Sequence, residues 1–452
     1  MEDILVKVGS LLLSLSILIT VHEFGHFLFA RLFKTRVNKF YLFFDFLFPM
    51  QNVLNFSLFK FKKGDTEYGL GWFPLGGYVQ IDGMVDESMD TEKLNEPAKP
   101  WEFRSKKAWQ RLLIMAGGVI FNIIMAVILY IAILFTWGES YLATKDATYG
   151  IAAGELATEI GLQDGDKILN VDGEEVEVFQ QIPIAIIEKE ADYIEIERDG
   201  QTQKITIPDG FIGKLIKDKR QNFIFVRRPF VVDSIPEESP MREAGVKSKD
   251  KIIAINGERI EWYHELRKAS IANAGKEIEL TLLRGSDTVE TKTAISEAGT
   301  MGFFANTNDV YFNISIKEYS FFSAIPRGFE RTYETVGSYL SQLRLLFTSS
   351  EVKVNESLGG FGTIGSLFPG KDNWTWIQFW SLTAFLSIIL AVANLLPIPA
   401  LDGGHIMFIF YEMVSGRKPS IKFLEYAQVI GMIILFGLMI YANGLDIIRA
   451  FK

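Results

Sequence analysis

The chain contains no cysteine. This absence excludes disulfide bonds, iron–sulfur clusters, zinc sites built on thiolates and a cysteine nucleophile. Histidine is also scarce, since the sequence has only 4. Any metal ion that the protein binds must therefore be held by histidine and carboxylate side chains.

Blocks of like charge are absent as well. The 46 basic and 55 acidic residues are mixed along the chain and give a formal net charge of −9, which excludes the basic surface typical of nucleic-acid-binding proteins. Hydrophobic residues make up 48% of the chain, charged residues only 22%, and the mean hydropathy is +0.17. This balance argues against a purely soluble protein, and the length allows about two to four domains.

Three long segments contain no charged residue, namely 112–138, 374–401 and 426–445. Each can cross the hydrocarbon layer of a membrane, which takes about 20 helical residues. A fourth apolar segment, roughly Ile4 to Leu32, carries two histidines and a glutamate inside its hydrophobic run. It lacks the basic start and the cleavage site of a signal peptide. The sequence therefore predicts four transmembrane helices.

Basic residues cluster beside these segments at 31–39, 104–111 and 417–422. Short loops rich in lysine and arginine lie on the cytoplasmic side of a membrane. This rule predicts that both chain ends and the long region 139–373 lie outside the cytoplasm.

The region between the second and third segments contains a repeat, because residues 161–173 and 245–257 follow one pattern. Each copy alternates β-branched residues and ends in Asp-Gly or Asn-Gly, which predicts a hairpin with a tight turn. The pattern resembles PDZ domains, which bind peptides by adding them as a strand to a sheet edge. A pair of rigid spacers that bind nothing is the alternative.

The predicted fold class is a polytopic α-helical membrane protein with a membrane-associated β-hairpin region and two extracytoplasmic PDZ-like domains of mainly β structure. A segment from 317 to about 349 mixes aromatic with charged residues and predicts an amphipathic helix near the membrane surface. The predicted parts are a membrane part over 1–138, PDZ-like domains over 139–222 and 223–310, an amphipathic connector over 311–373 and a second membrane part over 374–452.

His22-Glu23-Phe24-Gly25-His26 has the pattern His-Glu-x-x-His. On a helix the two imidazoles project from one face at a separation that suits one metal ion. Glu23 can take a proton from water at that ion and pass it to a leaving amine. Surface helices can carry this pattern without function, but ionisable groups inside an apolar helix are costly and usually functional. The motif therefore predicts a zinc peptidase.

A catalytic zinc ion usually takes three protein ligands, and the motif supplies two. Asp402 is the predicted third ligand, because it follows two prolines at the end of the third segment. The first and third segments cross the membrane in the same direction, so the motif and Asp402 lie at matching depth. A turn residue before Gly403 is the alternative reading of Asp402, and His405 ranks below Asp402 as a ligand.

Through His22 to His26, through Asn394 to Gly404 and through four spans around PDZ-like domains, the chain resembles the site-2 protease family of intramembrane zinc metallopeptidases. The resemblance implies that His22, His26 and Asp402 bind Zn²⁺ and that Glu23 activates water. It also implies that Asn394 handles the substrate backbone. Phe73 to Val79 matches the family's membrane-associated hairpin, so that Gly76 and Gly77 take part in presenting substrate as an added strand.

The resemblance further implies cleavage within the transmembrane segment of a single-span membrane protein, of anti-sigma factor type or a remnant signal peptide. Another protease trims that substrate first, and the PDZ-like pair filters substrates by size. The implied location is the bacterial inner membrane, among lipid and without nucleic acid, with the active site toward the cytoplasm. The chain departs from the family between 40 and 70, where it is unusually aromatic.

Two other functions remain open at this point. A membrane scaffold or chaperone would use the zinc motif structurally, although a structural zinc site normally has a fourth protein ligand and none is obvious. A zinc transporter would need more histidine and aspartate within its spans.

Overall fold

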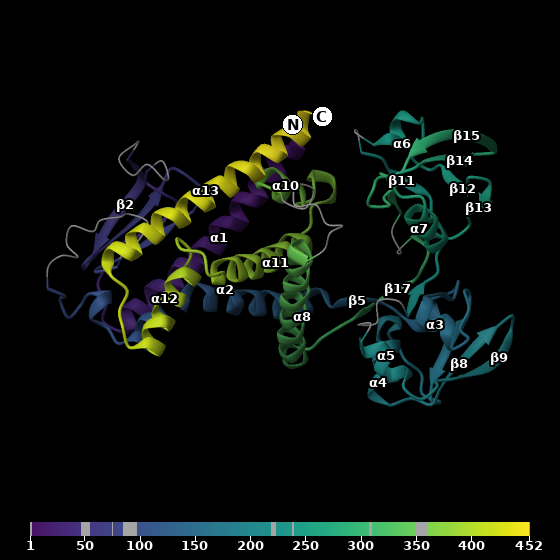
Figure 1. Cartoon of the computed structure of the whole chain (residues 1–452), viewed down its shortest axis with the longest axis horizontal. Helices are drawn as coiled ribbons and strands as arrows, with labels where there is room; N and C mark the ends of the chain where they lie inside the picture. The colour runs from purple at the N-terminus through teal and green to yellow at the C-terminus, as the bar shows by residue number, and fades with distance from the viewer. Residues whose placement is uncertain are drawn as a thin grey trace. The chain divides into compact units, whose positions relative to one another are not determined.

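The computed structural model describes residues 2–46, 55–74, 76–84, 97–217, 223–236, 239–306, 310–348 and 359–451. The chain divides into two compact units. One unit comprises Met1–Gly138 together with Glu318–Lys452, and the other comprises Glu139–Lys317. Figure 1 shows that the first unit is mainly helical and that the second, in teal, contains most of the strands.

Four helices in the described part of the first unit are long and apolar enough to cross a membrane. They are α1 (Glu2–Leu32), α2 (Ala108–Trp137), α11 (Trp376–Leu395) and α13 (Ile421–Phe451). At 1.5 Å per residue even α11, the shortest, reaches about 30 Å. The expectation of four candidate spans is therefore confirmed.

The third apolar segment is a helix followed by a loop. Helix α11 ends at Leu395, because Pro397 and Pro399 cannot continue it. In the loop Ala400 has a φ of 80°, a left-handed backbone conformation that residues other than glycine rarely adopt. A separate helix, α12 (Asp402–Ser415), then begins. Asp402 thus lies at the start of a new helix and not at the end of the third span.

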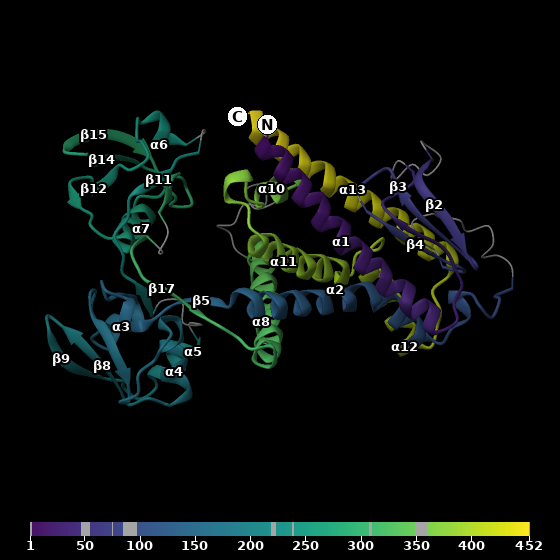
Figure 2. The ribbon, with the colours of Figure 1, turned by 180° about the vertical axis from the view of Figure 1, so that it is seen from behind.

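Helices α1 and α2 cross at glycines (Figures 1 and 2). A Cβ atom on Gly25 would lie 2.2 Å from the carbonyl oxygen of Gly117, and one on Gly117 would lie 2.5 Å from that of Gly25. The two backbones are therefore in contact at this point. Such close approach through small residues is typical of helix packing in lipid, where the hydrophobic effect does not draw helices together.

The described part of the first unit also contains α8 (Phe321–Thr348) and α10 (Phe361–Ser366). Helix α8 packs on α2, where a Cβ on Gly328 would lie 2.5 Å from Ile131 Cγ1. Phe322, Phe329 and Tyr333 of α8 are exposed, whereas Thr332 is buried. The helix is therefore amphipathic, with an aromatic outer surface.

A four-stranded sheet lies between α1 and α2 in the sequence and beside α1 in space (Figure 2). Its strands are β1 (Val37–Leu42), β2 (Ser57–Lys63), β3 (Thr66–Gly71) and β4 (Tyr78–Ile81), in the order β2-β3-β1-β4. Strands β1 and β3 are parallel, and the other pairs are antiparallel. Four aromatic residues, Tyr41, Phe44, Phe46 and Tyr78, form a buried cluster in which Tyr41 stacks on Tyr78, whereas Phe59 and Phe61 of β2 are exposed. Part of the aromatic stretch, 47–54, lies outside the described residues.

The second unit contains two lobes. The first lobe has β6 (Ile151–Ala153), α3 (Glu155–Glu159), β7 (Lys167–Val171), α4 (Ile182–Glu188), β8 (Tyr193–Arg198), β9 (Gln201–Thr206), α5 (Phe211–Lys217) and β10 (Ile224–Val226). The second lobe has β11 (Val232–Ser234), α6 (Pro240–Glu243), β12 (Lys251–Ile255), β13 (Glu258–Arg259), α7 (Tyr263–Ala272), β14 (Glu277–Arg284), β15 (Asp287–Ala294) and β16 (Phe304–Ala305). Strands β5 (Glu139–Leu142) and β17 (Ile314–Lys317), where the chain enters and leaves the unit, pair with each other.

Each lobe has its own hydrophobic core and its own antiparallel sheet, β7-β8-β9 in the first lobe and β13-β12-β14-β15 in the second. Strand β10 pairs with β6, so the core of the first lobe extends to Val226. The predicted tight turns are present, because Asp172-Gly173 and Asn256-Gly257 all have positive φ. The residues that flank each turn pair with each other, Val171 with Glu174 and Ile255 with Glu258.

Each lobe also contains its own ion pair with a buried aspartate, at the corresponding position. Asp166 in the first lobe and Asp250 in the second are each 1% exposed. Asp166 accepts two hydrogen bonds from Arg198, and Asp250 accepts two from Arg284. Each arginine also donates to a backbone carbonyl, that of Gly161 or Gly245. The aspartate occurs in both copies of the repeat. It therefore ties the start of β7 to the end of β8 in the first lobe, and the start of β12 to the end of β14 in the second.

We expect Arg284→Met to destabilise the second lobe by roughly 1–3 kcal/mol, the cost of leaving a buried acceptor unsatisfied. Hydrogen exchange of the amides in β12 and β14 measures this loss in the full-length protein. Lys292→Met is the matched control, because the Lys292–Glu279 pair is exposed on both sides and should contribute less than about 1 kcal/mol. Equal effects of the two substitutions would contradict the structural role of the Asp250 pair.

The Asp250 pair also sets the sign of a pH dependence. Because Arg284 and the backbone of Lys247 donate to Asp250, its pKa lies below the ordinary value. The stabilisation is then complete above about pH 4, near the pKa of an unfolded aspartate. It is lost as the pH falls through the lowered pKa of the folded protein.

Candidate functional site

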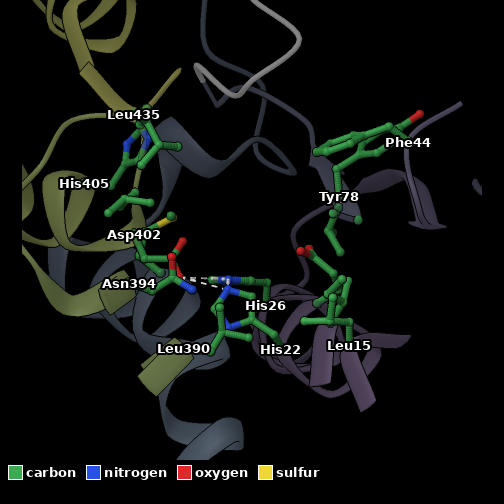
Figure 3. A pocket seen from close by; sticks show the side chains of 18 of the residues that line it. Leu15, His22, His26, Phe44, Tyr78, Leu390, Asn394, Asp402, His405 and Leu435 are labelled. Carbon is green, nitrogen blue, oxygen red and sulfur yellow. Dashed lines mark hydrogen bonds and ion pairs between the residues drawn. The ribbon is translucent and has the colours of Figure 1, made fainter. Parts of the chain in front are cut away.

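His22 and His26 lie one turn apart on α1, where both are buried, and Asp402 opens α12. His22 Nε2 is 3.1 Å and His26 Nε2 is 3.3 Å from the same carboxylate oxygen, Asp402 Oδ2. The two Nε2 atoms are 3.2 Å apart. Figure 3 shows the three side chains converging on one point.

This triangle of atoms fits a zinc ion. Tetrahedral ligands at the usual distances of about 2.0–2.1 Å from zinc lie roughly 3.3 Å from one another. The observed distances of 3.1, 3.2 and 3.3 Å match that spacing. Asp402 Oδ2 is buried and faces the two Nε2 atoms, and a buried carboxylate oxygen is costly unless a cation neutralises it. His22, His26 and Asp402 can therefore hold the ion together.

Helix α2 supplies the groups behind the two histidine rings. His26 Nδ1 lies 2.9 Å from the carbonyl oxygen of Ile114, which can only accept, so Nδ1 carries the hydrogen and Nε2 keeps its lone pair. His22 Nδ1 lies 3.2 Å from the side-chain amide of Asn122. A Cβ on Gly118 would lie 2.5 Å from His22 Cε1 and from His26 Nε2, so only glycine leaves room for both rings.

Asp402 is positioned by the loop before it and by α12. A Cβ on Gly403 would lie 2.2 Å from the carbonyl oxygen of Leu396, so glycine allows the start of α12 to touch the loop backbone. Further along α12, Glu412 Oε1 lies 2.5 Å from Arg111 Nη2 on α2, and both side chains are largely buried. This ion pair ties the helix that carries Asp402 to the helix that supports the histidines.

The site opens into a cavity of about 410 Å³. All seven site residues expected from the sequence line it: His22, Glu23, His26, Gly76, Gly77, Asn394 and Asp402. Gly77, immediately before β4, lies directly against α1, because a Cβ there would be 2.7 Å from Ile19 Cγ2 and 3.4 Å from Glu23 Cγ. The sheet therefore passes next to the glutamate of the motif.

His405 lines the same cavity but is not one of the three clustered ligand residues found among the described residues. Figure 3 shows it beside Leu435, on the far side of Asp402 from the two other histidines. Sequence reasoning missed Gly118 and Asn122. Two signals could have identified them: the Gly-Gly pair and the polar residue within the same apolar span.

In a comparison with known protein families, residues 10–438 match the sequence model of peptidase family M50. The chain belongs to peptidase family M50. The regulator of sigma-E protease RseP of Escherichia coli K12 is 27% identical over an alignment of 462 positions, gaps included, which covers 97% of this chain and 98% of the relative. Protease RseP of Yersinia pestis is 25% identical over 472 aligned positions, which cover 97% of this chain and 98% of the relative.

A Vibrio cholerae protein that is provisionally named a zinc metalloprotease is 27% identical over an alignment of 482 positions, gaps included, which covers 99% of this chain and all of the relative. These matches confirm the resemblance to the site-2 protease family and the expected class, a zinc metalloprotease. They extend over both units, so the M50 assignment includes the lobed region as well as the helices.

We expect Gly118→Ala to weaken zinc binding at least tenfold, because the methyl group would displace the two ligand rings from their shared point. Equilibrium dialysis of the purified full-length protein against buffered zinc measures this change. Gly9→Ala, on α1 with open space around its Cβ position, is the control and should bind zinc like the wild type. Unchanged affinity in Gly118→Ala would show that the rings do not need this gap.

Proposed function

We propose that this chain hydrolyses a peptide bond within the transmembrane segment of a single-span membrane protein. The observation that carries the proposal is the convergence of His22, His26 and Asp402 at a cavity inside a bundle of membrane-crossing helices, with Glu23 lining the same cavity. Membership of family M50 supports the peptidase chemistry.

In this proposal His22, His26 and Asp402 would hold Zn²⁺, which would supply Lewis-acid polarisation of the scissile carbonyl and would lower the pKa of water to about 7. Glu23 takes the proton of the attacking water and delivers it to the leaving amide nitrogen. Glu23 follows His22 directly on α1, so its carboxylate reaches the cavity without being a member of the ligand cluster.

The sheet accounts for how a helical substrate becomes cleavable. A peptide bond in a transmembrane helix has its amide groups satisfied within the helix and is hard to attack. Strand β4 is at one end of the sheet order, and Tyr78, Val79 and Ile81 line the cavity. We assign to β4, with Gly76 and Gly77 before it, the binding of the unwound substrate as an added strand. Asn394 at the end of α11 then contacts the substrate backbone.

For the second unit we propose two PDZ-like domains outside the cytoplasm that filter substrates by size. Their sequence pattern, their paired tight turns and their matching buried ion pairs support two copies of one domain. The name of the Escherichia coli relative refers to sigma-E regulation. We accordingly propose an anti-sigma factor type substrate, or a remnant signal peptide, trimmed by another protease and cut at the bacterial inner membrane.

Glu23→Gln should keep zinc near one ion per chain and reduce cleavage by about 10²–10⁴-fold, because the amide preserves the side chain's shape but cannot accept the proton. Metal analysis and cleavage of a single-span substrate in detergent test this together. Glu290→Gln, on the exposed surface of the second lobe, is the control. Undiminished cleavage by Glu23→Gln would remove Glu23 from the mechanism. A wild-type protein that binds zinc but cuts no single-span substrate would favour the scaffold.

Topology has a direct test, because the chain has no native cysteine. A cysteine placed at Ser286, in the exposed turn between β14 and β15, should react with a membrane-impermeant reagent in intact spheroplasts. A cysteine at the exposed Lys418, between α12 and α13, should react only after lysis, because basic loops face the cytoplasm. The reverse pattern would invert the proposed orientation.

A further inference from the structure

Asn122 is a buried polar residue that the proposed reaction does not use. It lies in the middle of α2, is 0% exposed, and is surrounded by apolar helix. Its side-chain nitrogen is 3.2 Å from His22 Nδ1, whereas its side-chain oxygen has no partner in the described part of the chain. An unsatisfied buried acceptor is costly, so this asparagine calls for an explanation.

The two histidines of the site are supported by different kinds of group. The carbonyl oxygen of Ile114 behind His26 can only accept a hydrogen bond, so it permanently selects the ring form that has a free lone pair on Nε2. The amide behind His22 can either donate through Nδ2 or accept through Oδ1. Only His22 therefore has a partner that suits both neutral forms of the ring.

Each amide orientation matches one state of the ligand triangle. With Nδ2 toward His22 Nδ1, the ring hydrogen is on Nε2, which can donate to Asp402 Oδ2 at 3.1 Å or to His26 Nε2 at 3.2 Å. Metal binding through His22 Nε2 needs the opposite form, with the hydrogen on Nδ1 and an acceptor facing it. Asn122 Oδ1 becomes that acceptor when the amide turns over, because the two ends of an amide have nearly the same shape.

We propose that Asn122 is a positioning residue whose side-chain amide, with its acceptor end toward Nδ1, holds His22 in the ring form that ligates zinc. Ser387 on α11, itself 0% exposed, donates a hydrogen bond of 2.8 Å to the backbone carbonyl of Asn122. This contact fixes the backbone of Asn122 beside the His22 ring. The inference rests on the proposed ligand assignment.

Two substitutions of similar shape separate the donor from the acceptor. Asn122→Asp offers only acceptors toward His22, and Asn122→Leu offers neither donor nor acceptor. We expect Asn122→Asp to bind zinc at least as tightly as the wild type, and Asn122→Leu to bind it about 10–100-fold more weakly, the usual effect of losing a partner of a ligating histidine. Competition with a chromogenic zinc chelator measures both dissociation constants in purified full-length protein.

A second readout distinguishes positioning from a purely structural role. The unfolding midpoint should rise on adding zinc by more in Asn122→Asp than in the wild type, and by less in Asn122→Leu, because only the acceptor favours the zinc-binding ring form. A structural role predicts instead that both substitutions lower the midpoint equally with and without zinc. Thr332→Val is the control, since Thr332 is buried on α8 and donates its hydrogen bond to Gly328 of the same helix, away from the triangle.

Three outcomes would overturn the inference. One is an Asn122→Leu dissociation constant within about threefold of the wild type, and another is equal weakening by the Asp and Leu substitutions. If Asn122→Asp does not fold, Asn122→Ala and Asn122→Leu are measured instead. Zinc affinity in both that equals that of Thr332→Val is then the third. A wild-type protein that binds no zinc would overturn the ligand assignment itself, which these outcomes leave intact.

Discussion

The close crossing of α1 and α2 at Gly25 and Gly117 is the contact on which the candidate site depends. Because the two backbones touch there, the carbonyl of Ile114 and the amide of Asn122 reach the nitrogens behind His26 and His22. A side chain at either glycine would push the helices apart and remove both partners at once. In lipid this approach depends on packing and hydrogen bonds, since apolar burial gives little preference for helix over lipid contact.

Hydrogen bonds from the third span hold this crossing from behind. Thr383 of α11 bonds Ser14 of α1, and Ser387 of α11 bonds the backbone of Asn122 on α2. All four groups are buried in a region where an unsatisfied polar atom is expensive. These two bonds lie among buried clusters that are apolar, so they align α1 and α2 with α11 at defined points.

Local patterns predicted much of this arrangement. The helical spacing of His22 and His26 and the matching depth of Asp402 suffice to bring three ligands together, and Asn-Gly at the end of an alternating strand suffices for a tight turn. Other features depend on contacts between distant residues. The order of the four strands around Tyr41 depends on pairing across the chain, and the role of Asn122 depends on which ring it faces. An uncharged polar residue within an apolar span has no periodicity that reveals its partner.

The third proposed ligand, Asp402, is held by different structural elements from the two histidines. His22 and His26 lie on one rigid helix, whereas Asp402 begins a short helix after a loop in which Ala400 has positive φ. The placement of Asp402 therefore depends on the Gly403 contact with the loop and on the Arg111–Glu412 ion pair. A metal ion held by the proposed ligands would link α1 to α12 and would add its binding free energy to these contacts. The ion proposed for the chemistry would then also stabilise the packing of α12 against the bundle.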